Sequence, residues 1–213
     1  MKKNLLQLIA MFMISCVAVV SYADDTTGIQ TLQTRWADIK YQTPEADQEK
    51  AFVSLVAEAE QLRKANNTAP YFIWEAIIRS TYAGAKGGLG ALDEVKKAKK
   101  LLEQSIKLDP AAMNGSAYTS LGSLYYQVPG WPVGFGDDKK AKDMLLKGLS
   151  YNPDGIDSNY FYGDYLLEQK EYKQAVAAFE KALKAAPRPG RESADAGRKG
   201  EIEAAMAKAK KHL

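Results

Sequence analysis

Prolines recur at the ends of similar apolar segments along this chain: Pro70, Pro110, Pro153 and Pro187. Counted back from each of them, a small residue stands five positions earlier and an apolar residue stands eight positions earlier. The last three copies also have an alanine twelve positions earlier: Ala98, Ala141 and Ala175. Because proline cannot continue a helix, each copy is expected to be a helix that ends just before its proline. The prolines are 40, 43 and 34 residues apart, and such periods predict a stack of helical repeats.

The last copy, from Ile156 to Pro189, resembles the tetratricopeptide repeat. The matching residues are Tyr162, Gly163, Leu166, Tyr172, Ala175, Phe179, Ala182 and Pro187. The preceding segment, 115–153, matches through Leu121, Gly122, Tyr125, Ala141, Leu145 and Gly148. A third copy has Ile78 and Arg79 where the family has Leu-Gly, and the earliest copy has Glu58 where alanine is expected.

This resemblance implies an all-α fold, a TPR-like helix-turn-helix superhelix (α-solenoid) of about three to four repeats with a C-terminal capping helix. The capping helix is expected within 191–213, beginning at about Glu201 because Gly197 and Gly200 delay it. A plain amphipathic helical bundle with unrelated prolines is the alternative. Stacked helical repeats present a binding surface, so the resemblance implies a non-catalytic interaction protein.

The first 23 residues have the pattern of a secretory signal peptide. Two lysines precede an apolar run, and Ser21-Tyr22-Ala23 is followed by acidic residues, so cleavage is expected after Ala23. A retained membrane anchor is one alternative, and a lipoprotein modified at Cys16, the only cysteine, is another. Cleavage would leave a repeat domain at 24–190 in the periplasm or outside the cell, free of disulfides.

Charge and composition argue against several classes of function. The net charge of +3 includes Lys2 and Lys3, so the chain after Ala23 is nearly neutral and nucleic acid is not expected as a partner. His212 is the only histidine, which excludes a Ser-His or Cys-His nucleophile and the usual zinc sites. No cofactor and no metal are therefore expected. Acidic pairs remain open as hydrolytic groups, although no motif indicates them.

The segment between Tyr126 and Lys139 is the least helical part of the chain. It contains two prolines and three glycines together with Trp131 and Phe135, and it predicts a structured loop pinned by these two aromatic residues. The glycine-rich stretch 84–92 has the same spacing to its flanking Tyr and Ala, which predicts a second, neighbouring loop. The pattern is similar to that of the tetratricopeptide-like T components of TRAP-type transporters.

Two hypotheses follow for the partner. In tetratricopeptide repeats the first helix of each pair lines the concave face, and this resemblance implies that a protein partner binds there. The residues concerned are Thr119, Ser123, Tyr126, Gln127, Asp157, Tyr160, Asp164 and Glu168. The transporter resemblance implies instead an accessory protein that binds a small solute or a solute-binding protein. An apolar pocket under Trp131 and Phe135 would favour the solute, and an open polar groove would favour the protein partner.

Overall fold

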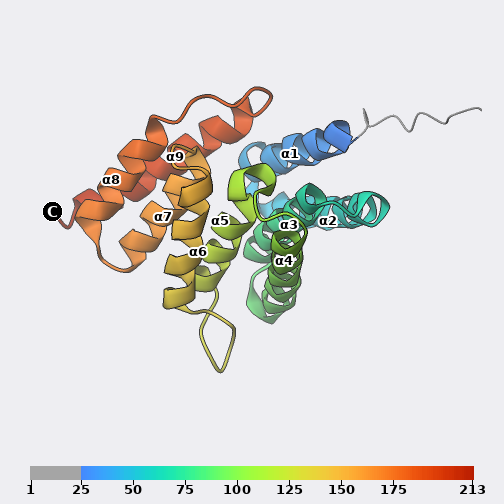
Figure 1. Cartoon of the computed structure of the whole chain (residues 1–213), viewed down its shortest axis with the longest axis horizontal. Coiled ribbons are helices and arrows are strands. Elements are labelled where there is room, and N and C mark those ends of the chain that lie inside the picture. Colours follow the sequence, from blue (N-terminus) through green and yellow to red (C-terminus); the bar gives the residue numbers. More distant parts are fainter. Residues whose placement is uncertain (1–24) are drawn as a thin grey trace, which may run out of the picture.

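The computed structural model describes residues 25–213, so the expected signal peptide and Cys16 lie outside the described residues. The regular secondary structure of 25–213 is helical, apart from an isolated bridge between Gly130 and Gly136. Figure 1 shows the order of the helices in space. They are α1 Asp25–Gln42, α2 Glu45–Asn66, α3 Ala69–Lys86, α4 Gly88–Leu108, α5 Ala112–Gln127, α6 Asp138–Tyr151, α7 Ile156–Glu168, α8 Tyr172–Leu183 and α9 Glu192–Lys210. Within residues 25–213, no helix has the length and apolar character that crossing a membrane requires.

The helices pack as consecutive hairpins, α3 with α4, α5 with α6 and α7 with α8, while α1 and α2 form a less regular first pair. Each repeated proline follows the second helix of a pair, as expected from the sequence. The α-solenoid predicted from the repeats is therefore confirmed, and a plain bundle is excluded.

Small residues bring the two helices of a hairpin together. A methyl group added at Gly122 of α5 would lie 2.7 Å from Cγ of Leu145 in α6. The equivalent position in the next hairpin, Gly163 of α7, faces Phe179 of α8 at the same distance, to Cε1. Leu145 and Phe179 are completely buried, so a glycine on one helix receives a large apolar side chain from the other.

Arg79 occupies the corresponding position in the α3–α4 hairpin and is buried. Its Nε lies 2.8 Å from Oε1 of Glu75, its Nη1 lies 2.7 Å from Oε2 of Glu94 in α4, and its Nη2 lies 2.8 Å from Oε2 of Glu60 in α2. Arg63 of α2 forms a further ion pair with Glu75. A buried guanidinium requires such partners, and here they replace the missing Leu-Gly pair by joining three helices.

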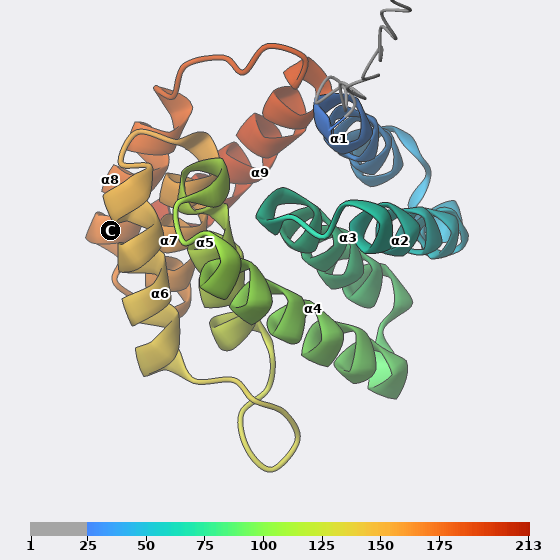
Figure 2. The same ribbon diagram turned by 45° about the vertical axis from the view of Figure 1, so that its right-hand side comes forward.

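The two ends of the superhelix contact one another through α1 and α9. Tyr41 Oη donates a hydrogen bond to Glu201 Oε2 at 3.3 Å, and Gln42 Nε2 donates one to Ser193 Oγ at 3.5 Å. The ring of Tyr41 packs so closely on Gly197 that any side chain there would collide with it. Figure 2 shows α9 crossing back to α1, so the helices enclose the concave face.

Two expectations about helix boundaries are wrong. The capping helix begins at Glu192, nine residues before Glu201, because Gly197 is needed for the contact with Tyr41 and interrupts nothing. The stretch 84–92 is not a loop: α3 continues to Lys86, and Gly87 alone separates it from α4. Gly87 has a φ of 65°, which glycine adopts without strain, so longer helices take up the extra residues.

Candidate functional site

A central chamber of about 430 Å³ lies on the concave face, between the first helices of the repeats and α9. Helices α1, α3, α5 and α7 each contribute side chains, so the chamber is a product of the stacking. Its wall is formed by Trp36, Lys40, Trp74, Ile77, Ser80, Thr81, Met113, Asn114, Ser116, Thr119, Ser120, Ser123, Gln127, Asn152, Asp157, Ser158, Tyr160, Phe161, Arg188, Arg191, Arg198 and Glu201.

The N-terminal side of the chamber is aromatic. The rings of Trp36 and Trp74 meet edge to face with centroids 6.1 Å apart, and both residues are buried. Trp36 Nε1 donates a hydrogen bond to Thr81 Oγ1 at 2.9 Å, but Trp74 Nε1 is buried without a hydrogen-bond partner among the described residues. An indole N–H in that position usually finds an acceptor when it is buried. Trp74 therefore has an indole donor beside the chamber that no described residue satisfies.

The C-terminal side of the chamber is an ion-pair network centred on Asp157 of α7. Its Oδ2 lies 2.6 Å from Nη1 of Arg188, and its Oδ1 lies 2.8 Å from Nε of Arg198. Arg198 also pairs with Glu201 at 2.6 Å and stacks over the ring of Tyr160 at 4.3 Å. Burial opposes the ionisation of Asp157, but the two guanidinium groups outweigh it and lower the pKa of its carboxyl to about 2.

Arg191 is the cation that this network leaves without a carboxylate. Its guanidinium lies over the ring of Trp74 at 5.1 Å, and it forms no ion pair with any residue in 25–213. Its Nε is buried without a hydrogen-bond partner. Burial, followed by the neighbouring positive charge of Arg188, lowers the pKa of Arg191. The guanidinium of Arg191 and the indole of Trp74 thus lie in contact at the chamber wall. Arg191 Nε and Trp74 Nε1 each lack a hydrogen-bond acceptor among the described residues.

The structure brings five of the eight predicted concave-face residues to the chamber: Thr119, Ser123, Gln127, Asp157 and Tyr160.

The other three do not line the chamber. Tyr126 Oη donates a hydrogen bond to Asp164 Oδ2 at 2.7 Å, which joins α5 to α7. Gln127 Nε2 donates to the same phenol oxygen at 3.1 Å. Burial, followed by the charge of Asp164, raises the pKa of Tyr126. Burial also raises the pKa of Asp164. Glu168 is exposed at the end of α7. This side of the predicted face is thus occupied by contacts within the protein.

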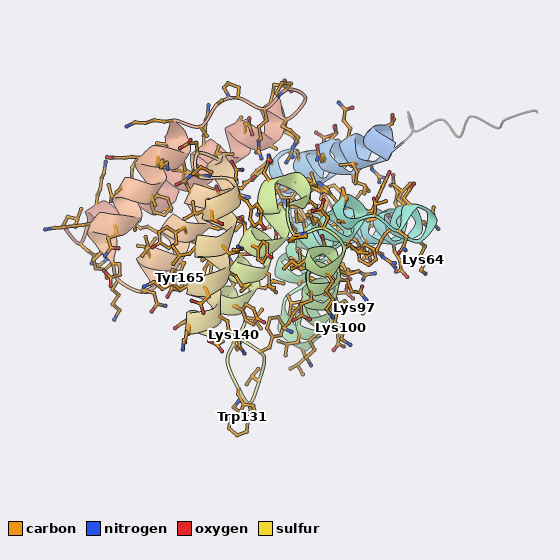
Figure 3. All side chains as sticks on the ribbon, in the orientation of Figure 1. Lys64, Lys97, Lys100, Trp131, Lys140 and Tyr165 are labelled. Atoms are coloured by element: carbon orange, nitrogen blue, oxygen red, sulfur yellow. The ribbon has the colours of Figure 1, made fainter. Side chains whose placement is uncertain are left out.

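The two loop aromatics lie outside the chamber and differ from each other. Phe135 is partly buried and its ring meets that of Tyr125 edge to face at 5.9 Å. Trp131 is 90% exposed at the tip of the loop, which projects from the molecule (Figure 3). The expectation that both aromatics pin the loop is therefore wrong for Trp131, because hydrogen bonds and Phe135 hold the loop without it.

Several chamber residues were not singled out from the sequence. Arg188, Arg191 and Arg198 enter the chamber only because α9 folds back onto α1, which no repeat motif encodes. Met113 and Asn114 reach the wall through a left-handed turn of residues 113–115, with φ values of 50°, 55° and 71°. Asn114-Gly115 was the available signal, since this pair is frequent in such turns.

No group of acidic, histidine or cysteine side chains suited to a metal ion occurs among the described residues. His212 stacks on Tyr172 with ring centroids 4.4 Å apart, and neither residue lines the chamber.

The comparison with family models agrees with the architecture of the last hairpin. The family model of the tetratricopeptide repeat matches residues 156–189, which form α7, α8 and the turn after them. This hairpin matches the tetratricopeptide repeat, a fold typical of non-catalytic protein–protein interaction scaffolds. Among solved structures, the crystal structure of MamA protein is similar, with 18% identity over 87% of this chain and 92% of that chain and a TM-score of 0.44. No curated protein sequence matches significantly.

Proposed function

We propose that this protein is a non-catalytic scaffold of the periplasm, or of the secreted fraction, that takes an anionic group of a protein partner into its central chamber. The observation that carries the proposal is Arg191, a cation in the chamber with no carboxylate of its own. A buried or partly buried charge is costly unless it is paired, so an anion that neutralises it gains affinity.

The charges of the chamber support an anionic occupant. Lys40, Arg188, Arg191 and Arg198 line it, against the carboxylates of Asp157 and Glu201. Asp195 adds one more carboxylate, 2.5 Å from Arg188, so the cations still exceed the carboxylates by one. A guanidinium presents two parallel N–H donors, which match the paired oxygens of a carboxylate or a phosphate group.

The proposed compartment rests on the sequence of residues 1–23, whose charged start, apolar run and small residues before Asp24 are typical of an exported chain. Cys16 is the only cysteine, so a chain cleaved after Ala23 would contain no cysteine and could form no disulfide in an oxidising compartment.

The test is a crosslinking pull-down from envelope extract with the wild type and Arg191→Met. Methionine keeps much of the apolar contact with Trp74 and removes the charge. Lys199→Met is the matched control, because Lys199 is an exposed residue of α9, the helix that Arg191 precedes as N-cap. The expected result is a protein retained by the wild type and the control and lost with Arg191→Met at unchanged helix content. The same proteins with all three baits would refute the proposal.

A small anionic solute is the second candidate, because the contact between α1 and α9 encloses the chamber. Its volume of about 430 Å³ is in the range of small-molecule sites. Trp74, with Trp36 beside it, would pack on an apolar body while Arg191 binds the anion. Such binding would suit the transporter accessory role, with the site in the chamber and not under the loop.

This candidate has its own assay. Phe replaces Trp131, so that Trp36 and Trp74, the remaining tryptophans, both report on the chamber. Phenylacetate is titrated against the neutral 2-phenylethanol, with the Arg191→Met form as control. A fluorescence change with phenylacetate alone, abolished in Arg191→Met, supports a solute site without any protein partner. Equal responses to both compounds would contradict the role of Arg191.

A further inference from the structure

The loop between α5 and α6, residues 128–137, is a braced projection (the Trp131 loop). Gly136 N donates a hydrogen bond to Pro129 O at 3.0 Å, and Asp137 N donates one to Tyr125 O at 2.8 Å. A methyl group at Gly136 would collide with the backbone of Val128, so the two strands of the loop cross closely. Phe135 is held between Tyr125 and the ammonium of Lys99, which lies 5.8 Å from its ring.

The hydrogen bonds and the Phe135 contacts of the Trp131 loop keep apolar side chains exposed to solvent. Trp131 is 90% exposed and Val133 is 56% exposed at the tip, whereas Trp36 and Trp74 are buried. Leu89, at the start of α4, is 84% exposed. Figures 1 and 2 both place the turn between α3 and α4, and with it the start of α4, at the same edge of the molecule as the Trp131 loop. One surface could therefore meet all three side chains.

Lysines surround this edge. Figure 3 shows Lys140 at the base of the loop, and Lys97 and Lys100 on the neighbouring helix α4. Lys100 and Lys139 form no ion pair with another described residue, whereas Lys140 pairs with Asp137 at 3.3 Å. Asp137 is itself engaged as the N-cap of α6, accepting a hydrogen bond from Lys140 N at 3.0 Å. Among the charged residues of 86–100 and 137–140 that form no ion pair with a described residue, four are basic and two are acidic, so the free charge near the loop is mainly positive: Lys86, Lys96, Lys100 and Lys139 against Asp93 and Asp138.

We propose that the Trp131 loop is a docking site for an anionic phospholipid surface, with Trp131 entering the interfacial region and the lysines facing the headgroups. The loop tip offers Trp131 and Val133, and α4 adds Leu89, so the exposed apolar surface is much smaller than the roughly 800 Å² per partner of a stable protein interface. Tryptophan favours the membrane–water interface, and each lysine near an anionic leaflet contributes about a fivefold gain in binding. This inference concerns a different surface from the chamber and does not depend on what the chamber binds.

The experiment uses the protein purified from the envelope in whichever N-terminal form it occurs there, so that every variant shares that segment. Iodide quenching of tryptophan fluorescence is measured with vesicles of equal parts phosphatidylglycerol and phosphatidylcholine, and with phosphatidylcholine alone. Because Trp36 and Trp74 are buried, the quenchable emission comes from Trp131. The expected result is protection from iodide and a blue shift with the anionic vesicles alone, reversed at high salt.

Variants separate the docking site from other membrane affinity. Trp131→Ala should weaken sedimentation with anionic vesicles, and Lys100→Gln/Lys139→Gln should weaken it by several fold, up to about 25-fold if both lysines reach the surface. Leu108→Ala, at the other end of α4, is the matched control because Leu108 is also exposed, at 54%, and it should bind as the wild type does. Trp131 left fully quenchable beside anionic vesicles, or protected only by added envelope protein, would overturn the proposal.

Discussion

Replacing Arg198 with methionine should destabilise the protein more than any surface substitution. The side chain is buried, pairs with Asp157 and Glu201, and stacks over Tyr160. Methionine preserves much of the apolar part of the arginine side chain, so the loss of stability is due to the removed charge and its contacts. The carboxylate of Asp157 then loses one of its two guanidinium partners inside the chamber.

The size of the loss follows from these contacts. Removing one partner of a buried ion pair costs about 3–5 kcal/mol. Arg188 remains 2.6 Å from Asp157, and Lys40 remains 3.7 Å from Glu201, so neither carboxylate is left alone. The lower end, about 3 kcal/mol, is therefore expected. For a domain of this size, each kcal/mol lowers the melting temperature by about 2–4 °C, which gives a decrease of about 6–12 °C.

The assay is urea unfolding followed by far-ultraviolet circular dichroism, for Arg198→Met, Asp157→Asn and the double variant. Because the two groups are in contact, the double variant should lose less than the sum of the single losses, by about 1 kcal/mol or more. Arg35→Met is the control: Arg35 and Glu58 form a partly exposed pair on α1 and α2, which contributes at most about 1 kcal/mol. Additive losses, or a loss for Arg198→Met no larger than that of Arg35→Met, would refute the reasoning.

Gly163→Ala should cost about 1–3 kcal/mol in urea unfolding because the new methyl group meets Phe179, whereas Gly200→Ala, which has open space, should cost nothing. Burial raises the pKa of Asp164, so its ionised form is disfavoured in the folded state; Asp164→Asn should leave the melting temperature at pH 7 unchanged or higher, and a clear decrease would contradict this. The pKa of Asp157 is lowered to about 2, so its contribution is present above the unfolded value and is lost as the pH falls from about 4 to 2. Wild type should lose stability in that window, and a melting series should show a smaller loss for Asp157→Asn.

The repeats were predictable because their packing is local. Gly163 and Phe179 stand at fixed offsets from Pro187, and the two helices that carry them are neighbours in sequence, so the motif encodes the contact. The same reasoning placed Asp157 and Tyr160 on the concave face, and both line the chamber. Tyr126 was assigned to the same face, but its hydroxyl is used by Asp164.

The closure of the superhelix was not predictable in this way. The contact of Tyr41 with Gly197 and Glu201 joins helices more than 150 residues apart, and no periodic pattern relates them. Gly197 therefore suggested a delayed helix start, whereas its lack of a side chain permits a contact. Trp131 shows the opposite error: an aromatic residue among glycines and prolines suggested burial, but backbone hydrogen bonds and Phe135 hold that loop without it.

The contact between α1 and α9 also changes how the stack must respond to length. In an open solenoid each repeat interacts only with its neighbours, so repeats can be added and the ends fray independently. Here α1 and α9, at opposite ends of the described superhelix, are in contact, so the stack closes on itself. An inserted hairpin would separate Tyr41 from Gly197 and open the chamber. The number of hairpins is thus fixed by geometry, and variation in length is confined to outward loops such as 128–137.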